Sequence, residues 1–196
     1  MKQRIAKKHR VTNETNIYLK MNLDGQGRYK VSTTLPFLDH MLELFSKHSL
    51  IDLEVKAAGD THIDAHHLVE DIGITLGLAL REALGDKKGI QRYGFFLLPM
   101  DESLSYVAID LSGRAHIEYE AKGIKPNWTT FDLDLLEDFF RALGGAALMN
   151  LHIKLLKGRN LHHMAEGMFK AFAKALSMAV AKDKRYKGIP STKGSL

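Results

Sequence analysis

The stretch "HHLVEDIGITLGLALREAL", residues 66–84, decides the fold because it returns 96 residues later as "HHMAEGMFKAFAKALSMAV", residues 162–180. In both copies, two adjacent histidines and a glutamate open a segment that is predicted to be a helix. Two further pairs of stretches match in the same order: "NETNIYLKMNLDG" (13–25) with "DESLSYVAIDLSG" (101–113), and "LDHMLELF" (38–45) with "LEDFFRAL" (136–143). Three matches in one order indicate an internal duplication.

Both halves are predicted to contain the same series of elements, in the order βββαβα. In the first half these are a strand at 2–10, a hairpin of strands 16–24 and 28–35 around "DGQG", a helix at 37–48 with Pro36 in its first turn, a strand at 50–55 and a helix at 66–84 that ends at Gly85. In the second half the strands are expected at 91–98, 105–111, 115–120 and 148–153, with "SGR" as the hairpin turn.

This order predicts an α+β fold in which two sheets, each covered by helices, pack together as a pseudo-dimer. We place the first half at residues 1–88 and the second at 89–185, divided near the polar, glycine-flanked "GDKKG". Residues 186–196 form a tail rich in Gly, Pro and Ser, without periodicity. The whole is expected to be a single catalytic domain.

The composition excludes several classes of protein. With 196 residues and 45% hydrophobic content the chain can bury a core, and with no cysteine it has neither disulfides nor thiolate metal sites. The first ten residues lack the apolar segment of a signal peptide, and no stretch is long enough to span a bilayer. The net charge of +5 suits a small anionic substrate as well as a nucleic acid, but the basic residues are dispersed and do not alternate with aromatic ones. We expect a cytoplasmic protein without membrane or nucleic-acid partners.

The spacing HHxxE on a helix predicts ligands for metal ions. His66 and Glu70, one turn apart, share a helix face, whereas His67 points about 100° away and faces a different ion. The second copy offers the same arrangement with His162, His163 and Glu166. Two such helices brought together by the pseudo-symmetry would complete two sites. Imidazole and carboxylate ligands without thiolate suit Mn²⁺, Fe²⁺, Zn²⁺ or Ni²⁺.

The preceding helix and strand of each half add further candidates. His40 and its repeat mate Asp138 are both suitable ligands for Mn²⁺ or Fe²⁺. Glu14 and its repeat mate Glu102 stand where the chain enters a hairpin, and such a carboxylate is either a general base or a charge at the rim of the site. His48 ends the first short helix, where it either caps the helix or belongs to the site.

Several cations and one hydroxyl are candidates for binding phosphate, although solvated surface charge is the ordinary explanation for most of them. Lys170 lies one turn beyond Glu166, and Arg114 stands in a tight turn where backbone amides and a guanidinium can converge on an anion. Arg92 opens the second half. In "PSTKG", Ser191 and Lys193 combine a hydroxyl and a cation next to a glycine.

The stretches "FLDHML", "HIDAHHLVEDIG", "PMDESL", "DLSGR", "HHMAEGMFKAFAKAL" and "PSTKG" closely resemble the imidazoleglycerol-phosphate dehydratase family, and the resemblance covers residues 4–194. It implies a lyase of histidine biosynthesis that dehydrates imidazole glycerol phosphate to imidazole acetol phosphate. It also implies a duplicated fold of the ribosomal protein S5 domain 2 kind, two Mn²⁺ ions per active site, and a homo-oligomer of twenty-four subunits with active sites at subunit boundaries.

The resemblance also assigns roles to individual residues. It implies metal ligands at His40, His66, His67, Glu70, His162, His163 and Glu166. Many members carry histidine at position 138, where this chain has Asp138, so the identity of one ligand departs from the pattern. Phosphate contacts are implied for Arg92, Arg114, Lys170, Ser191 and Lys193. Glu14 becomes the leading acid–base residue.

Two other functions also fit a metal site with cations around it. A dinuclear metallohydrolase acting on a phosphate ester would use both, although such sites rely on several aspartates and only Asp138 is offered here. A metal-binding cage without catalysis would need no phosphate contacts, so loss of Lys193 and Arg114 would leave its function unchanged.

Overall fold

The structure, a computed structural model, describes residues 3–121 and 134–196. It confirms the α+β fold and the duplication, because each half contains three strands, a helix, a strand and a longer helix. The elements are β1 (Ile5–Val11), β2 (Thr15–Asn22), β3 (Tyr29–Ser32), α1 (Pro36–Ser49), β4 (Asp52–Gly59), α2 (His66–Leu84), β5 (Tyr93–Met100), β6 (Ser103–Asp110), β7 (His116–Glu120), α3 (Leu135–Ala147), β8 (Asn150–Lys157) and α4 (Leu161–Val180).

The predicted pairing of the second and third strands in each half is wrong. The strand orders are β1-β2-β4-β3 and β5-β6-β8-β7, so β4 lies between β2 and β3, antiparallel to the first and parallel to the second. The "DGQG" loop crosses the start of β4 instead of closing a hairpin. There, Oδ1 of Asp52 accepts hydrogen bonds from the backbone N–H groups of Gln26 (2.8 Å) and Arg28 (2.9 Å). The hairpins are β1–β2 and β5–β6.

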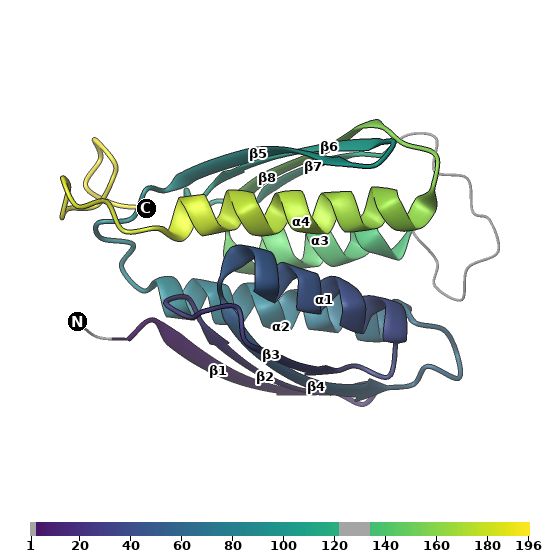
Figure 1. Cartoon of the computed structure of the whole chain (residues 1–196). Coiled ribbons are helices and arrows are strands. Elements are labelled where there is room, and N and C mark those ends of the chain that lie inside the picture. Colours follow the sequence, from purple (N-terminus) through teal and green to yellow (C-terminus); the bar gives the residue numbers. More distant parts are fainter. Residues whose placement is uncertain (1–2, 122–133) are drawn as a thin grey trace.

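The four helices lie between the two sheets, and each helix packs on a helix of the other half (Figure 1). The short helix α1 packs on α4, and α2 packs on α3, so within one chain each long helix has a short helix as its main helical partner. One hydrophobic core runs through both halves. In the described parts of the chain, no helix is long and apolar enough to cross a membrane.

Local hydrogen bonds begin both long helices at the histidine pairs. Asp64 accepts a hydrogen bond of 2.8 Å from the backbone N–H of His66 at the start of α2. At the start of α4, the side chain of Asn160 accepts from the backbone N–H groups of His162 (2.9 Å) and His163 (3.4 Å), which is the usual role of an N-cap asparagine. Each histidine pair is therefore held in the first turn of a rigid helix.

Candidate active site

A group of metal-ligating side chains forms where α1 meets the start of α4. His40 from α1 approaches His162 and Glu166 from α4, and one ligand atom of each lies within 4.8 Å of the others. Nε2 of His162 is 3.1 Å from Oε2 of Glu166, and Nε2 of His40 is 3.7 Å from the same oxygen. Among the residues that the structure describes, this is the one group of three so close together. We call these residues the first half-site.

The pseudo-symmetry places a second, looser group where α3 meets the start of α2. Nδ1 of His66 is 3.3 Å from Oδ2 of Asp138, which occupies the position that His40 has in the first half-site. Glu70 follows one turn later on α2 and is exposed. We call His66, Glu70 and Asp138 the second half-site. In both half-sites, the short helix of one half contributes a side chain next to the long helix of the other half. The repeat alone did not reveal that the two halves combine in this way.

Glu166 is the one carboxylate of the first half-site; it is buried, and its charge is balanced by neighbouring groups. Burial alone would raise its pKa, but an ion pair with Lys170 and a hydrogen bond with His162 outweigh burial and hold the pKa below its usual value. Lys170 therefore lies beside the first half-site, where its ammonium group already forms an ion pair with Glu166. Its predicted contact with phosphate stays a prediction.

The adjacent histidines diverge, as the helix geometry predicted. The rings of His66 and His67 are inclined by 72°, and those of His162 and His163 by 85°. His67 donates from Nδ1 to Oδ2 of Asp60 at 3.0 Å, and its Nε2 lies 4.0 Å from Oε1 of Glu14. The hydrogen bond with Asp60 raises the pKa of His67. That His66 and His67 bind different ions stays a prediction.

His163 has a corresponding set of carboxylate neighbours. Its Nδ1 donates to Oε2 of Glu102 at 2.8 Å, and its Nε2 lies 3.7 Å from Oδ2 of Asp101. The other oxygen of Glu102 accepts from the backbone N–H groups of Asn160 (2.7 Å) and Arg159 (3.2 Å). The bond from His163, followed by that from Asn160, lowers the pKa of Glu102 to about 2.

The sequence pointed to some of these carboxylates and missed others. Glu102 was singled out only as the repeat mate of Glu14, with its role left open. Asp60 and Asp101 were not singled out. Each directly follows a strand and lies in a polar turn, where the sequence shows no periodicity. Asp60 lies in the loop that leads to the first histidine pair, and this closeness in the sequence was the one signal available.

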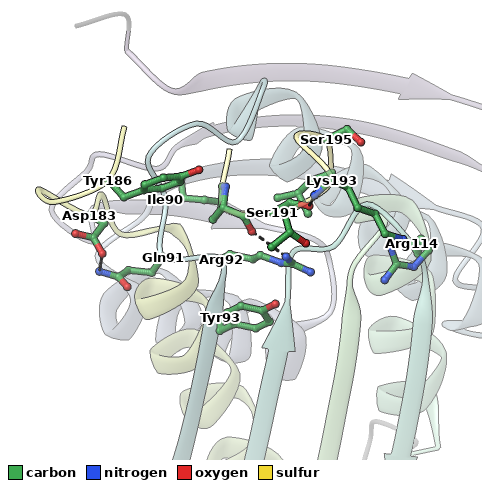
Figure 2. A pocket seen from close by; sticks show the side chains of 13 residues that line it. Ile90, Gln91, Arg92, Tyr93, Arg114, Asp183, Tyr186, Ser191, Lys193 and Ser195 are labelled. Carbon is green, nitrogen blue, oxygen red and sulfur yellow. Dashed lines mark hydrogen bonds between the residues drawn. The ribbon is translucent and has the colours of Figure 1, made fainter. Parts of the chain in front are cut away.

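The residues predicted to bind phosphate fall into two separate places. Arg92, Arg114, Ser191 and Lys193 line a pocket of about 710 Å³ between the start of β5 and the tail of the chain (Figure 2). By contrast, His48 is half-buried beside Lys170 and Lys174, where burial and then these two cations lower its pKa.

Arg92 already has several partners inside this pocket. Its guanidinium donates to both carboxylate oxygens of Asp110, at 2.7 and 3.0 Å, and to the carbonyl oxygen of Pro190 at 2.8 Å (Figure 2 shows the bond to the tail). It also lies 4.7 Å from the centre of the Tyr93 ring. Arg92 therefore holds the tail in place, whatever else it binds.

The pocket and the first half-site lie at opposite ends of α4. The backbone N–H of Arg92 donates to the carbonyl oxygen of Ala179 in the last turn of α4, whereas His162 is in its first turn. At about 1.5 Å per residue, the stretch of helix between them is about 25 Å long. Figure 1 shows the same separation, with the C-terminal tail at one end of α4 and the start of α4 at the other.

Comparison with known proteins identifies the family. The family model described as imidazoleglycerol-phosphate dehydratase matches residues 33–176. The proteins of that name from Endomicrobium trichonymphae and Desulforamulus reducens are 61% and 56% identical over 196 residues, which cover each chain completely. The crystal structure of the Staphylococcus aureus protein has a TM-score of 0.83 at 40% identity and covers 91% of this chain and 99% of its own. The Pyrococcus furiosus structure has a TM-score of 0.81 at 35% identity, with 96% and 100% covered. The chain therefore belongs to the imidazoleglycerol-phosphate dehydratase family of enzymes.

Proposed function

We propose that this enzyme dehydrates imidazole glycerol phosphate to imidazole acetol phosphate in histidine biosynthesis, with two Mn²⁺ ions in each active site. The observation that supports it most directly is the pair of half-sites related by the duplication. His40, His162 and Glu166 converge in one of them, and His66 meets Asp138 in the other. The substrate has two ring nitrogens, and each could bind one metal ion. The two half-sites occupy equivalent positions in the repeat and would supply those two ions.

The side chains present fit Mn²⁺. The first half-site offers two imidazole nitrogens and a carboxylate oxygen within 4.8 Å of one another, and imidazole with carboxylate is a donor set that Mn²⁺ accepts. His40, His162 and Glu166 would hold one ion, and His66, Glu70 and Asp138 the other. A divalent ion bound to an imidazole nitrogen withdraws electron density from the ring and makes its neighbourhood more acidic.

Glu14 is placed to move a proton. Its carboxylate is 52% exposed and lies 4.0 Å from Nε2 of His67, on the side of the imidazole that is free of Asp60. A solvated carboxylate at this position can take a proton from the middle carbon of the glycerol chain, while the hydroxyl leaves as water from the carbon attached to the ring. The enol formed in this way becomes the ketone when the carbon attached to the ring takes up a proton. We assign this role to Glu14.

The active site requires more than one copy of the chain. The pocket around Arg92 and Lys193 is about 25 Å along α4 from His162. A substrate built from one five-membered ring, three carbons and one phosphate is far shorter than this distance. One chain therefore cannot hold both ends of the substrate, and the phosphate-binding residues must come from a different copy than the half-site. This supports a homo-oligomer with active sites at subunit boundaries.

The outer face of the second sheet supports self-association. Tyr93, Phe95 and Leu97 alternate along the edge strand β5, and all three side chains are exposed on the face turned away from the helices. Their repeat mates on β1 are Ile5, Lys7 and His9, so the equivalent face of the first sheet is more polar. An exposed apolar stripe of this kind marks an interface. We expect copies of this chain to meet here, within an assembly of twenty-four.

The reaction is tested by incubating the enzyme with Mn²⁺ and imidazole glycerol phosphate. We expect a ketone product that retains its phosphate and no turnover after the metal is removed by chelation. Release of inorganic phosphate would instead identify a phosphate-ester hydrolase. Metal binding without any product would favour a non-catalytic metal-binding cage.

The shared site is tested by mixing two inactive variants. Lys193→Ala removes a cation of the pocket, and Glu166→Gln removes a ligand of the first half-site. After dissociation and reassembly together, some sites would combine an intact pocket with an intact half-site, so we expect activity to return in part. Each variant reassembled alone is the control. No recovery in mixed oligomers would contradict the shared site.

A further inference from the structure

We propose that Asp60 and Glu102 are the positioning residues for His67 and His163, and that the two halves recruit them from non-equivalent places in the repeat. Each carboxylate holds the proton on Nδ1 of its histidine, so that Nε2 presents its lone pair to a metal ion. The inference rests on the proposed function, because it assumes that both histidines bind Mn²⁺.

In the first half, the side chain of Asp60 makes a hydrogen bond with His67. It is the first residue after β4, its side chain is 17% exposed, and Oδ2 accepts from Nδ1 of His67 at 3.0 Å. Its other oxygen, Oδ1, is buried and has no hydrogen-bond partner within the described residues. Burying a carboxylate without hydrogen-bond partners costs free energy of desolvation. The hydrogen bond with His67 offsets most of this cost for Asp60.

In the second half, Glu102 is fixed from both sides. It stands in the turn between β5 and β6, and Oε2 accepts from Nδ1 of His163 at 2.8 Å. Oε1 accepts from the backbone N–H groups of Arg159 and Asn160, which lead into α4. The carboxylate therefore links the turn, the start of the helix and the imidazole, and it sets the orientation of the ring relative to the helix.

The equivalent positions in the opposite halves cannot do the same. The first residue after β8, the counterpart of Asp60, is Gly158, where an added Cβ would lie 2.4 Å from Cγ of Met164 and 2.7 Å from Oγ of Ser103. No carboxylate fits there. Glu14, the counterpart of Glu102, lies on the Nε2 side of His67. Because Asp60 orients His67, Glu14 is not needed to orient it.

The physical reason is the tautomerism of imidazole. A neutral histidine carries one proton, and only the nitrogen without it can bind a metal ion. A carboxylate accepts a hydrogen bond but cannot donate one, so it fixes the proton on the nitrogen that it contacts. An amide in its place can donate through its NH₂ group and favour the wrong tautomer.

The test is a titration of the full-length assembled enzyme with Mn²⁺, followed by electron paramagnetic resonance of the free ion. In Asp60→Asn we expect one of the two ions to bind about 10–100-fold more weakly, and in Glu102→Gln the other ion, with the remaining ion unchanged. Gln at 102 keeps an acceptor for the two backbone amides. Asp86→Asn, an exposed carboxylate paired with Lys88, is the matched control and should bind both ions normally.

The outcomes separate this inference from the proposed function. A wild-type enzyme that binds no Mn²⁺ would contradict the proposed function itself. A wild-type enzyme that binds two ions, with both variants binding as tightly, would overturn the positioning roles. Equal weakening of both ions together with a lower melting temperature would show a merely structural role and would also overturn them. If either amide variant fails to fold, Asp60→Glu and Glu102→Asp keep the acceptor, and they should weaken the same single ion by a smaller factor.

Discussion

Glu14 and Glu102 occupy the same position in the two halves of the molecule and have different surroundings. Both stand in the turn between the first two strands of their half. Glu14 is 52% exposed and only approaches His67, whereas Glu102 is 22% exposed and accepts hydrogen bonds from His163 and two backbone amides. A duplication supplies two copies of each side chain, but the neighbouring loops decide what each copy does. Here the different loops before α2 and α4 leave the carboxylate of Glu14 exposed and hold that of Glu102 in hydrogen bonds.

Arg4 and Arg92 show the opposite behaviour, because these repeat mates keep the same structural role. Each precedes the first strand of its half and pairs with a carboxylate, Asp24 or Asp110. Each also donates to a backbone carbonyl of the C-terminal part of the chain, at Val180 or Pro190. Only Arg92 lines the pocket near the tail. The repeat therefore preserved the anchoring of the strand, whereas the pockets differ, because Arg4 lines a separate pocket beside the end of α2.

The largest expected difference between the halves is the loss of turnover in Glu14→Gln. Removing a general acid–base group lowers kcat by about 10²–10⁴-fold, and we expect this loss at saturating Mn²⁺ with normal metal content. Glu102→Gln should instead lose activity at low Mn²⁺ and regain it as Mn²⁺ is raised. Turnover measured against Mn²⁺ concentration distinguishes them. Turnover in Glu14→Gln comparable to wild type would contradict its role.

The second expected difference is in how closely the long helices α2 and α4 pack on the helices of the other half. On α2, an added Cβ at Gly77 would lie 2.4 Å from the carbonyl oxygen of Leu143 on α3, whereas the repeat mate on α4 is already an alanine, Ala173. We expect Gly77→Ala to lower the free energy of unfolding by about 1–3 kcal/mol through overpacking. Thermal unfolding at fixed protein concentration measures it.

Gly145→Ala on α3 is the matched control for this helix contact. An added Cβ at Gly145 would meet nothing within 4 Å, and alanine is the better helix former. We expect this variant to be more stable by about 0.5–1 kcal/mol. Equal effects of the two substitutions would show that α2 and α3 do not approach as closely as described.

A smaller effect is expected for substitution of Arg4 and Arg92, which should differ in their influence on KM. Arg4→Lys and Arg92→Lys each lose a bidentate pair and a bond to a carbonyl, so both should lower the free energy of unfolding by about 1 kcal/mol. Only Arg92→Lys should also raise KM for the substrate, because only Arg92 lines the pocket near the tail, where we propose that the phosphate binds. Steady-state kinetics together with urea denaturation checks both parts. A raised KM in Arg4→Lys would contradict the separation of roles.

The smallest expected effect is a dependence of stability on pH in the first half. The hydrogen bond from Arg4 lowers the pKa of Asp24 below its model-compound value of 3.8. A carboxyl with a lowered pKa in the folded state contributes stability above the unfolded value, and this contribution is lost as pH falls through the lowered pKa. The free energy of unfolding should therefore fall more steeply below pH 3.8 in the wild type than in Asp24→Asn. Denaturation curves from pH 5 to pH 2 measure it, and parallel curves would contradict it.

Element types were predictable because they depend on local pattern and on repetition. The histidine pairs at residues 66–67 and 162–163, the helix that ends before Gly85 and the βββαβα order all follow from spacing within a single segment. The pairing of β2 with β3 was wrong because hairpin turns such as "DGQG" are recognised locally. The strand that lies between them, β4, comes from a part of the chain beyond α1 and pairs with both, and its Asp52 accepts hydrogen bonds from the "DGQG" loop.

The duplication, the fold class and the divergence of adjacent histidines could be inferred from the chain alone, because repetition and helical periodicity are local and fix which side chains can share a face. Which side chains meet depends on the tertiary structure. It joined His40 to the helix of the other half, gave His67 and His163 different carboxylates, and placed the pocket of Arg92 at the far end of α4. These contacts depend on how whole elements pack, and packing between distant segments leaves no periodic signal in the chain.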